Sequence, residues 1–169
     1  MAFNWNEISP GVYQSGQIVN KTDWQIIKDE SERIGKPIAI LDMQLERQDV
    51  PPEWETGYLT FWFPIPDSKF TIRHMPDNSM KTLFTCVGQV ATNLYNAGYM
   101  LWFHCAEGVS RATTAHTVFR MLQFKETRYQ ALKVIRRARP IVNPNPYFMD
   151  VLIQIEKEIR RNRSFNIFA

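Results

Sequence analysis

The feature of this chain that most limits its fold and its chemistry is the stretch from Tyr99 to Leu122, YMLWFHCAEGVSRATTAHTVFRML. An apolar run predicts a buried strand, and apolar residues at helical spacing after Arg111 predict a helix. The residues between them, from Cys105 to Arg111, must then form a tight loop. The backbone N–H groups of such a loop and the positive end of the helix can hold a tetrahedral oxyanion without a metal.

Three residues of this loop suit phosphate chemistry. Cys105 offers a thiol nucleophile, and Arg111, six residues later, can bond two phosphate oxygens at once. Gly108 supplies the backbone freedom that a closed loop needs. A structural cysteine followed by an accidental arginine would leave the strand, the glycine and the helix unexplained. We therefore predict that Cys105 and Arg111 are catalytic, and that the bound phosphate contacts Ala106, Glu107, Gly108, Val109, Ser110 and Arg111.

The segment His104 to Arg111, HCAEGVSR, resembles the signature of the cysteine-based protein tyrosine phosphatase superfamily: His-Cys, five residues, Arg. The resemblance extends from about Glu7 to the last helix. The short chain and a Pro-Asn turn at Asn145 point to the small atypical dual-specificity members. The resemblance implies a phosphomonoester hydrolase acting on phosphotyrosine, and also on phosphoserine or phosphothreonine, in proteins. It implies a phosphocysteine intermediate and no cofactor.

Departure of an alkoxide or phenoxide requires an acid. The family takes it from an aspartate on the loop after the preceding strand, and IPDS, Ile65 to Ser68, lies there. The resemblance thus assigns the acid to Asp67. The spacing from Asp67 to Cys105 is longer than is usual for small members, so Asp77 stays an alternative. Capping of the next helix by Asp77 or Asn78 would explain Asp77 without catalysis.

Other residues of the site are expected to support the loop. In the family the histidine of the signature orients the cysteine by hydrogen bonding, which makes His104 a supporting residue. Asn145 resembles the asparagine that braces the loop, although a plain turn residue explains it equally well. The family usually has Ser or Thr after the signature arginine, where a hydroxyl stabilises the departing thiolate. This chain has Ala112, and Thr113 or Thr114 could take over that role.

Alternating strand and helix patterns predict an α/β fold in one domain, residues 1–169, with a central mostly parallel sheet flanked by helices. The expected strands are a short edge strand at Val12 and Tyr13, a buried strand over Pro37–Met43 and another over Tyr58–Ile65. Capping boxes at Thr22–Gln25 and Thr127–Gln130 predict two helix starts.

Composition adds little to the functional argument. The 169 residues are 44% hydrophobic and 22% charged, with a net charge of +3, as in an ordinary globular protein. We expect a soluble monomer with no membrane or nucleic-acid partner, and no basic-apolar leader opens the chain. Cys86 and Cys105 do not suggest a disulfide scaffold, and a working thiolate needs a reducing compartment such as the cytoplasm. Cys86 is expected in the core.

Metal binding is not expected, because His74 and His116 have no acidic or cysteine partner at ligand spacing. Arginines near the end of the chain could attract acidic substrates, but a solvated helix face is the default explanation. They are Arg136, Arg137, Arg139, Arg160, Arg161 and Arg163.

Two alternatives to a protein phosphatase remain open at this point. One is a phosphatase for a phosphoinositide, a polyphosphate or an RNA 5′ phosphate. Relatives with such substrates tend to carry Lys or Arg inside the loop, whereas Glu107 would repel additional phosphates. The other is a phosphate-binding module that turns over slowly or not at all.

Overall fold

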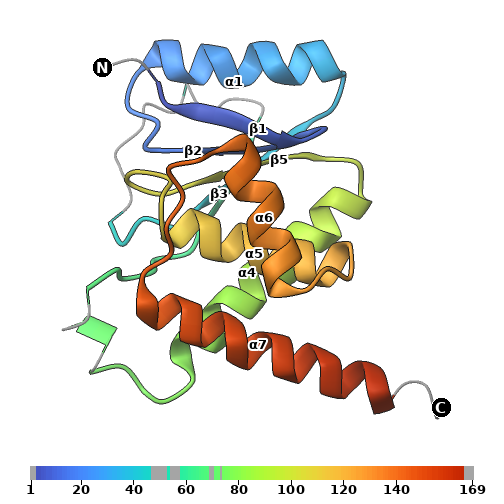
Figure 1. The fold of residues 1–169 in the computed structure, drawn as a ribbon. Coiled ribbons are helices and arrows are strands. Elements are labelled where there is room, and N and C mark those ends of the chain that lie inside the picture. The colour runs from blue at the N-terminus through green and yellow to red at the C-terminus, as the bar shows by residue number, and fades with distance from the viewer. Residues whose placement is uncertain (1–2, 47–52, 54–57, 69–70, 73, 166–169) are drawn as a thin grey trace.

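The computed structural model describes residues 3–46, 53, 58–68, 71–72 and 74–165. A five-stranded sheet lies at its centre, in the order β1-β2-β5-β3-β4 (Figure 1). The hairpin of β1 and β2 is antiparallel, and every other neighbouring pair is parallel. The prediction of a central, mostly parallel sheet is confirmed. The strands are β1 (Trp5–Ser9), β2 (Val12–Ser15), β3 (Ile38–Asp42), β4 (Leu59–Trp62) and β5 (Met100–His104).

Helices cover both faces of the sheet. One face is covered by α1 (Lys21–Ile34), and the other by the remaining four helices (Figure 1). These four are α4 (Ser79–Asn96), α5 (Arg111–Gln123), α6 (Arg128–Ala138) and α7 (Pro146–Phe165). None of the helices in the described ranges is long and apolar enough to cross a membrane.

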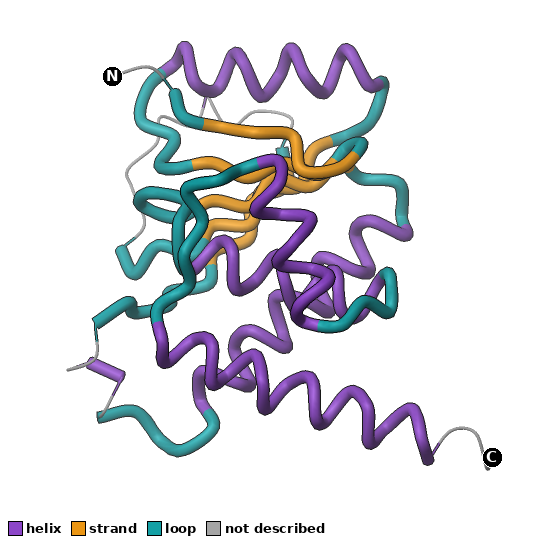
Figure 2. The backbone as a smooth tube through the Cα atoms, in the orientation of Figure 1, coloured by secondary structure: helices purple, strands orange, loops and turns teal. Residues whose placement is uncertain are grey.

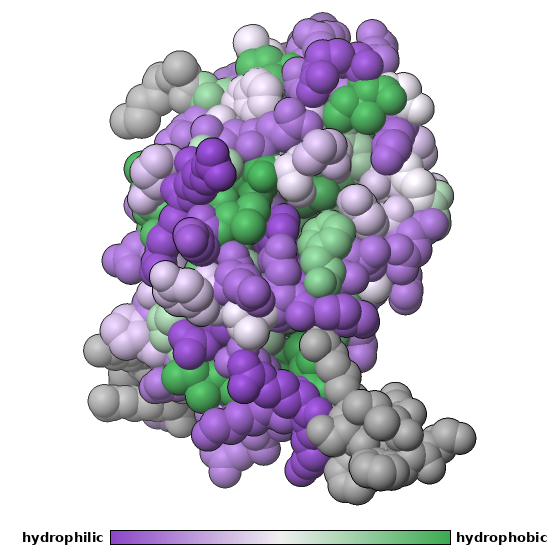
Figure 3. Space-filling view, turned by 45° about the vertical axis from the view of Figure 1, so that its right-hand side comes forward, coloured by the Kyte–Doolittle hydropathy of each residue, from purple (hydrophilic) through white to green (hydrophobic). Residues whose placement is uncertain are grey.

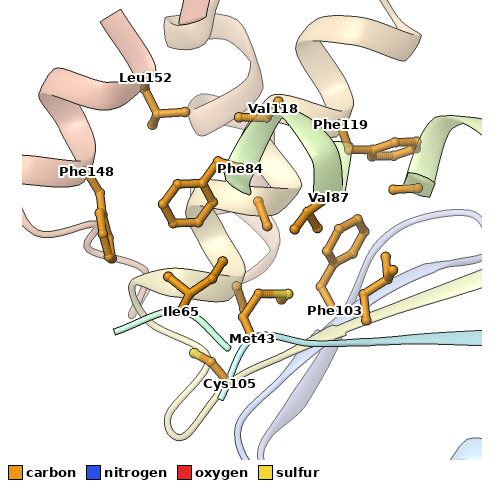
Figure 4. Packing of buried hydrophobic residues seen from close by; sticks show 14 of the residues in the cluster. Met43, Ile65, Phe84, Val87, Phe103, Cys105, Val118, Phe119, Phe148 and Leu152 are labelled. Atoms are coloured by element: carbon orange, nitrogen blue, oxygen red, sulfur yellow. The ribbon is translucent and has the colours of Figure 1, made fainter. Parts of the chain in front are cut away.

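Two hydrophobic cores lie on the two faces of the sheet, because alternate strand residues point to opposite sides. Met100 and Trp102 of β5 pack into the core on the α1 side, whereas Leu101 and Phe103 pack into the larger core. Figure 4 shows the larger core, with Cys105 at its edge beside Met43. All residues of β3 and β5 are buried, which explains why these strands read as continuous apolar runs.

The helix that follows the loop after β5 lies inside the protein. Every residue of α5 from Ala112 to Met121 is buried. Its close approach to α4 depends on Gly88, where a Cβ would come within 2.6 Å of the Val118 side chain. The two helices therefore pack closely at this point.

Two sequence predictions about the first half of the fold are wrong. Val12 and Tyr13 belong to an interior strand, since β1 adds an outer strand through a hairpin and becomes the edge. The Thr22–Gln25 capping box does not form. Instead α1 begins after Asn20, whose side chain accepts a hydrogen bond from the Asp23 N–H.

The capping box at Thr127–Gln130 is confirmed at the start of α6. Figure 2 shows loops gathered on the side of the sheet where the chain leaves β5 and where α6 connects to α7. Ligands of open α/β sheets bind at the carboxyl ends of the strands. On the face shown in Figure 3, hydrophilic side chains predominate and hydrophobic ones form only small separate patches.

Candidate active site

The loop between β5 and α5 places Cys105 at the carboxyl end of the central strand. Cys105 follows the last residue of β5 and is only 2% exposed. Five residues, 106–110, then connect it to α5, which begins at Arg111. The helix start therefore points its N-terminal end into the loop that begins at the cysteine.

The carbonyl oxygens of this loop are all held by groups outside it. The Ala106 oxygen accepts from the Gln17 N–H at 3.0 Å, and the Val109 oxygen accepts from the Asn143 N–H at 2.9 Å. The Gly108 oxygen accepts from the Gln14 side chain at 3.0 Å. Arg139 donates to the Glu107 and Gly108 oxygens, and the Ser110 oxygen accepts from Thr114.

No acceptor among the described residues takes a hydrogen bond from the N–H groups of Glu107 to Ser110. The carbonyls are thus engaged on the outside of the loop while its amides stay available for an anion. Concave groups of free amides of this kind bind phosphate in many folds.

Gly108 makes the tightest contact of the loop with its surroundings. Its φ is +67°, and a Cβ there would lie 2.2 Å from the Ser15 carbonyl oxygen and 2.8 Å from the Gly16 nitrogen. Backbone atoms cannot move aside as a flexible side chain can. The role predicted for this glycine therefore has a direct steric cause, namely the close approach of β2 to the loop.

Arg111 and Asp67 face each other next to the loop. The Arg111 Nε lies 3.4 Å from Asp67 Oδ2, and the Arg111 side chain is 12% exposed. Arg111 Nη1 donates to the carbonyl oxygens of Met43 and Ile65, both at 3.3 Å. These contacts fix the guanidinium by one nitrogen and leave Nε without a hydrogen-bond partner within the described structure.

The turn before α7 contributes Asn145 to the same place. Asn145 Nδ2 donates to Asp67 Oδ1 at 2.7 Å, and Ser110 Oγ donates to the same oxygen at 3.4 Å. The Asn145 Oδ1 accepts from the Phe148 N–H at 2.8 Å and so caps α7. Asn145 is therefore more than a turn residue: it joins the last helix to the carboxylate beside Arg111.

The alternative acid, Asp77, lies elsewhere. It lines a hollow of about 590 Å³ between α4 and α7, together with Lys81, Tyr147 and Val151. The capping role expected for Asp77 or Asn78 is wrong, because Asn78 occupies the cap position and makes no side-chain hydrogen bond there. The structure thus brings Asp67, and not Asp77, to Arg111.

His104 is buried beneath the loop. Its Nε2 lies 3.7 Å from Asp42 Oδ1 on the neighbouring strand. Burial lowers the pKa of this imidazole, and the charge of Asp42 opposes that effect. His104 Nδ1 has no hydrogen-bond partner within the described structure, so the hydrogen bond expected to orient the cysteine is not seen there.

Ala112 lies at the start of α5, where the family usually has a Ser or Thr hydroxyl. Neither neighbouring threonine hydroxyl is available to replace it. Thr113 Oγ1 donates to the Val109 carbonyl oxygen at 2.9 Å, and Thr114 Oγ1 donates to the Ser110 carbonyl oxygen at 2.9 Å. Each hydroxyl has a single hydrogen, which these backbone bonds occupy. The compensation considered for Thr113 or Thr114 is therefore absent from this arrangement.

Two residues lie where the sequence did not predict them. Cys86 was expected in the core but is exposed, so no thiol partner for Cys105 approaches from the buried face of α4. Arg139 was grouped with solvated arginines but is 1% exposed, and it donates to the Gly108 carbonyl oxygen of the loop between β5 and α5. Within the described residues no three His, Cys, Asp or Glu side chains form a cluster that could hold a metal ion.

Comparisons with known proteins identify one partial sequence relative and several solved structures that share this fold. No protein-family model matches the chain. Human dual specificity protein phosphatase 1 is 30% identical over 67 residues, which are 40% of this chain and 18% of that protein. The similarity therefore spans less than a fifth of that relative's length.

Solved structures match almost the whole chain. Human DUSP28 superposes with a TM-score of 0.70 at 16% identity, covering 92% of this chain and 95% of that one. PTPMT1 in complex with PI(5)P superposes with a TM-score of 0.74 at 17% identity, covering 94% and 98%. At these identities the likeness establishes the fold.

Proposed function

We propose that this chain, which has the fold of the small dual-specificity phosphatases in the cysteine-based protein tyrosine phosphatase superfamily, is a cysteine-dependent phosphomonoester hydrolase. One observation carries the proposal. A buried cysteine opens a loop whose carbonyls are all engaged outside it, and an arginine and an aspartate meet beside that loop. These groups would serve as nucleophile, anion site, fixed cation and proton donor.

The reaction would proceed in two steps. Cys105 Sγ attacks phosphorus, the bond from phosphorus to the leaving oxygen breaks, and Asp67 gives its proton to that oxygen. Water then attacks the phosphocysteine, Asp67 takes a proton from the water, and Sγ leaves. Loop amides and Arg111 stabilise the charge on the phosphoryl oxygens in both steps. Asn145 and Ser110 would hold the Asp67 carboxylate in place between the steps.

A phosphorylated protein is the substrate class that the loop favours. No side chain from Ala106 to Ser110 is cationic, and Glu107 is exposed at the loop. A second phosphate would meet that carboxylate, whereas a single phosphate on an amino-acid side chain would not. A working thiolate also needs a reducing compartment, so we place the protein in the cytoplasm.

A phosphoinositide is the second candidate substrate, and the observation in its favour is the likeness to PTPMT1 crystallised with PI(5)P. A panel of phosphotyrosine, phosphoserine and phosphothreonine peptides beside phosphoinositides separates the two. Turnover of the peptides with kcat/KM well above that of any phosphoinositide supports a protein phosphatase, and the reverse order supports a lipid phosphatase.

Hydrolysis of an aryl phosphate tests the reaction itself. It should proceed in EDTA, be blocked by vanadate, and vanish in Cys105→Ser and Arg111→Ala. Cys86→Ser is the matched control, because this second cysteine is exposed and should leave activity unchanged. Activity that survives Cys105→Ser, or that requires a divalent metal, would exclude this mechanism.

A further inference from the structure

Arg139, the residue that ends α6, lies behind the catalytic loop and is almost fully buried. Its Nε donates to the Gly108 carbonyl oxygen at 3.0 Å, and its Nη2 donates to the Glu107 carbonyl oxygen at 3.1 Å. One planar guanidinium therefore binds two consecutive carbonyls of the loop. Turning these two carbonyls outward orients the peptide units whose amides, on Gly108 and Val109, remain available to the anion site.

The third nitrogen of Arg139 connects the loop to the first strand of the chain. Nη1 donates to Asn4 Oδ1 at 2.9 Å and to Asn6 Oδ1 at 2.7 Å. The Asn4 carbonyl oxygen in turn accepts from the Gly16 N–H at 3.1 Å, next to the close approach of β2 to Gly108. The N-terminal segment thus holds the guanidinium from the side opposite the loop.

The charge of Arg139 has no carboxylate partner among the described residues. All four of its hydrogen-bond acceptors are neutral. Burying a cation without a counter-charge costs free energy, so other groups must stabilise the Arg139 guanidinium. Burial lowers the pKa of this guanidinium, and the electrostatic interaction with the nearby Cys105 opposes that effect. A phosphate dianion in the loop would supply the missing negative charge.

We propose that Arg139 is a positioning residue of the catalytic loop, and that Asn4 and Asn6 make the N-terminal segment part of the phosphate-binding apparatus. This inference deepens the proposed function and rests on it. Arg139 touches no substrate: it acts through the peptide units of Glu107 and Gly108. Loss of its bonds would let these units turn and point their amides away from the phosphate.

Arg139→Met tests the proposal, because methionine keeps an apolar stem and removes both the charge and all donors. Arg137→Met, at an exposed site on the same helix, is the matched control. Arg139→Lys keeps the charge, but its single nitrogen cannot bind two carbonyls and two asparagines at once. The double variant Asn4→Ala, Asn6→Ala removes only the two side-chain acceptors of Arg139 Nη1 and keeps its bonds to the loop carbonyls.

The readouts are the Kd for inorganic phosphate, kcat for an aryl phosphate, and the NMR positions of the loop amides in the free protein. For Arg139→Met we expect displaced Gly108 and Val109 amide signals, a phosphate Kd raised at least about tenfold and a kcat lowered by about 10²-fold, the scale for a misplaced reactive group. Arg139→Lys and the asparagine pair should change the same quantities less, and Arg137→Met should change none.

A purely structural arginine would give a different result. The proposal is wrong if Arg139→Met lowers only the thermal midpoint and leaves the loop amide signals, the phosphate Kd and kcat unchanged. If Arg139→Met does not fold, the same criterion applies to Arg139→Lys. A wild-type protein that binds phosphate but hydrolyses nothing would refute the proposed function alone. A wild-type protein that binds no phosphate would overturn both.

Discussion

At the scale of single residues, the Asp67 carboxylate is the most informative group, because three others converge on it. Asn145 and Ser110 donate to one of its oxygens, and Arg111 Nε lies 3.4 Å from the other. A carboxylate held in this way by its neighbours keeps one position while its proton comes and goes. Asp77, in the hollow between α4 and α7, has no such neighbours from the loop.

Replacement of Asp67 by Asn should lower kcat by about 10² or more, because the leaving oxygen loses its proton donor. The loss should be greatest for substrates with basic leaving groups. Asp77→Asn is the control and should leave kcat nearly unchanged. Steady-state rates on a series of aryl phosphates measure both, and an inverted result would assign the acid to Asp77.

Ala112 should make hydrolysis of the phosphocysteine the slow step. No hydroxyl at this position stabilises the departing thiolate, and the hydrogens of Thr113 and Thr114 are bonded to backbone carbonyls. A burst of leaving group should precede a slow steady state whose rate hardly depends on the leaving group. Ala112→Ser should raise kcat about tenfold to a hundredfold, the value of one hydrogen bond to a developing anion.

Stopped-flow measurements on the wild type and Ala112→Ser provide the comparison. A wild type without a burst, together with a variant without a gain, would mean that another group, such as a water molecule, already stabilises the thiolate.

Residues that are close in sequence could be grouped into a site from the residues alone, whereas Asp67 and Asn145, which meet only in space, could be assigned only through the family resemblance. Cys105 and Arg111 share one loop, so their spacing alone indicated a site. Asn145 and Asp67 are 78 residues apart and meet because α7 begins beside the loop after β4. Arg139 shows most clearly what the sequence alone could not predict. Its neighbours Arg136 and Arg137 are exposed, and nothing in its local sequence distinguishes it from them.

At the scale of secondary structure, helix starts show where local patterns can mislead. Two polar residues spaced as in a capping box occur at Thr22–Gln25 and at Thr127–Gln130, but only the second pair forms the box. The N-cap of α1 lies two residues earlier, because Asn20 adopts the extended backbone of a cap and accepts from the Asp23 N–H. The two central strands were better predicted, since the apolar runs of β3 and β5 are buried on both faces.

Asn20→Ala should therefore lower the free energy of unfolding by about 1 kcal/mol, the usual cost of removing an N-cap side chain. Thr22→Ala should change it little, because Thr22 lies inside the helix and caps nothing. Urea denaturation of the two variants at neutral pH measures the difference. A larger loss for Thr22→Ala than for Asn20→Ala would contradict the assigned start of α1.

At the scale of the whole molecule, two buried histidines connect folding stability to pH. Burial lowers the pKa of His104 and lowers that of His116 further, with the charge of Arg120 adding to the effect at His116. His116 Nδ1 lies 3.1 Å from Gln14 Oε1, and its ring stacks on Phe103. Both imidazoles are thus buried, His116 on α5 against Phe103 and His104 at the end of β5.

Acidification should destabilise the protein through these two groups. Below the ordinary histidine pKa of about 6.5, the unfolded chain takes up protons that the folded protein does not, so the free energy of unfolding falls with pH. The limiting slope is about 1.4 kcal/mol per pH unit for each histidine. Urea denaturation between pH 8 and pH 5 measures it, and His116→Gln should reduce the slope. A stability that rises on acidification would contradict this assignment.

The central claim is that Cys105 carries the phosphoryl group during turnover. The most direct measurement is acid quenching of the enzyme during steady-state hydrolysis of an aryl phosphate, followed by mass spectrometry of its peptides. The account predicts one phosphoryl group on Cys105, in near-stoichiometric amount because Ala112 slows its removal, and none on Cys86 or in Cys105→Ser. Full turnover with Cys105 unmodified at every quench time would contradict it.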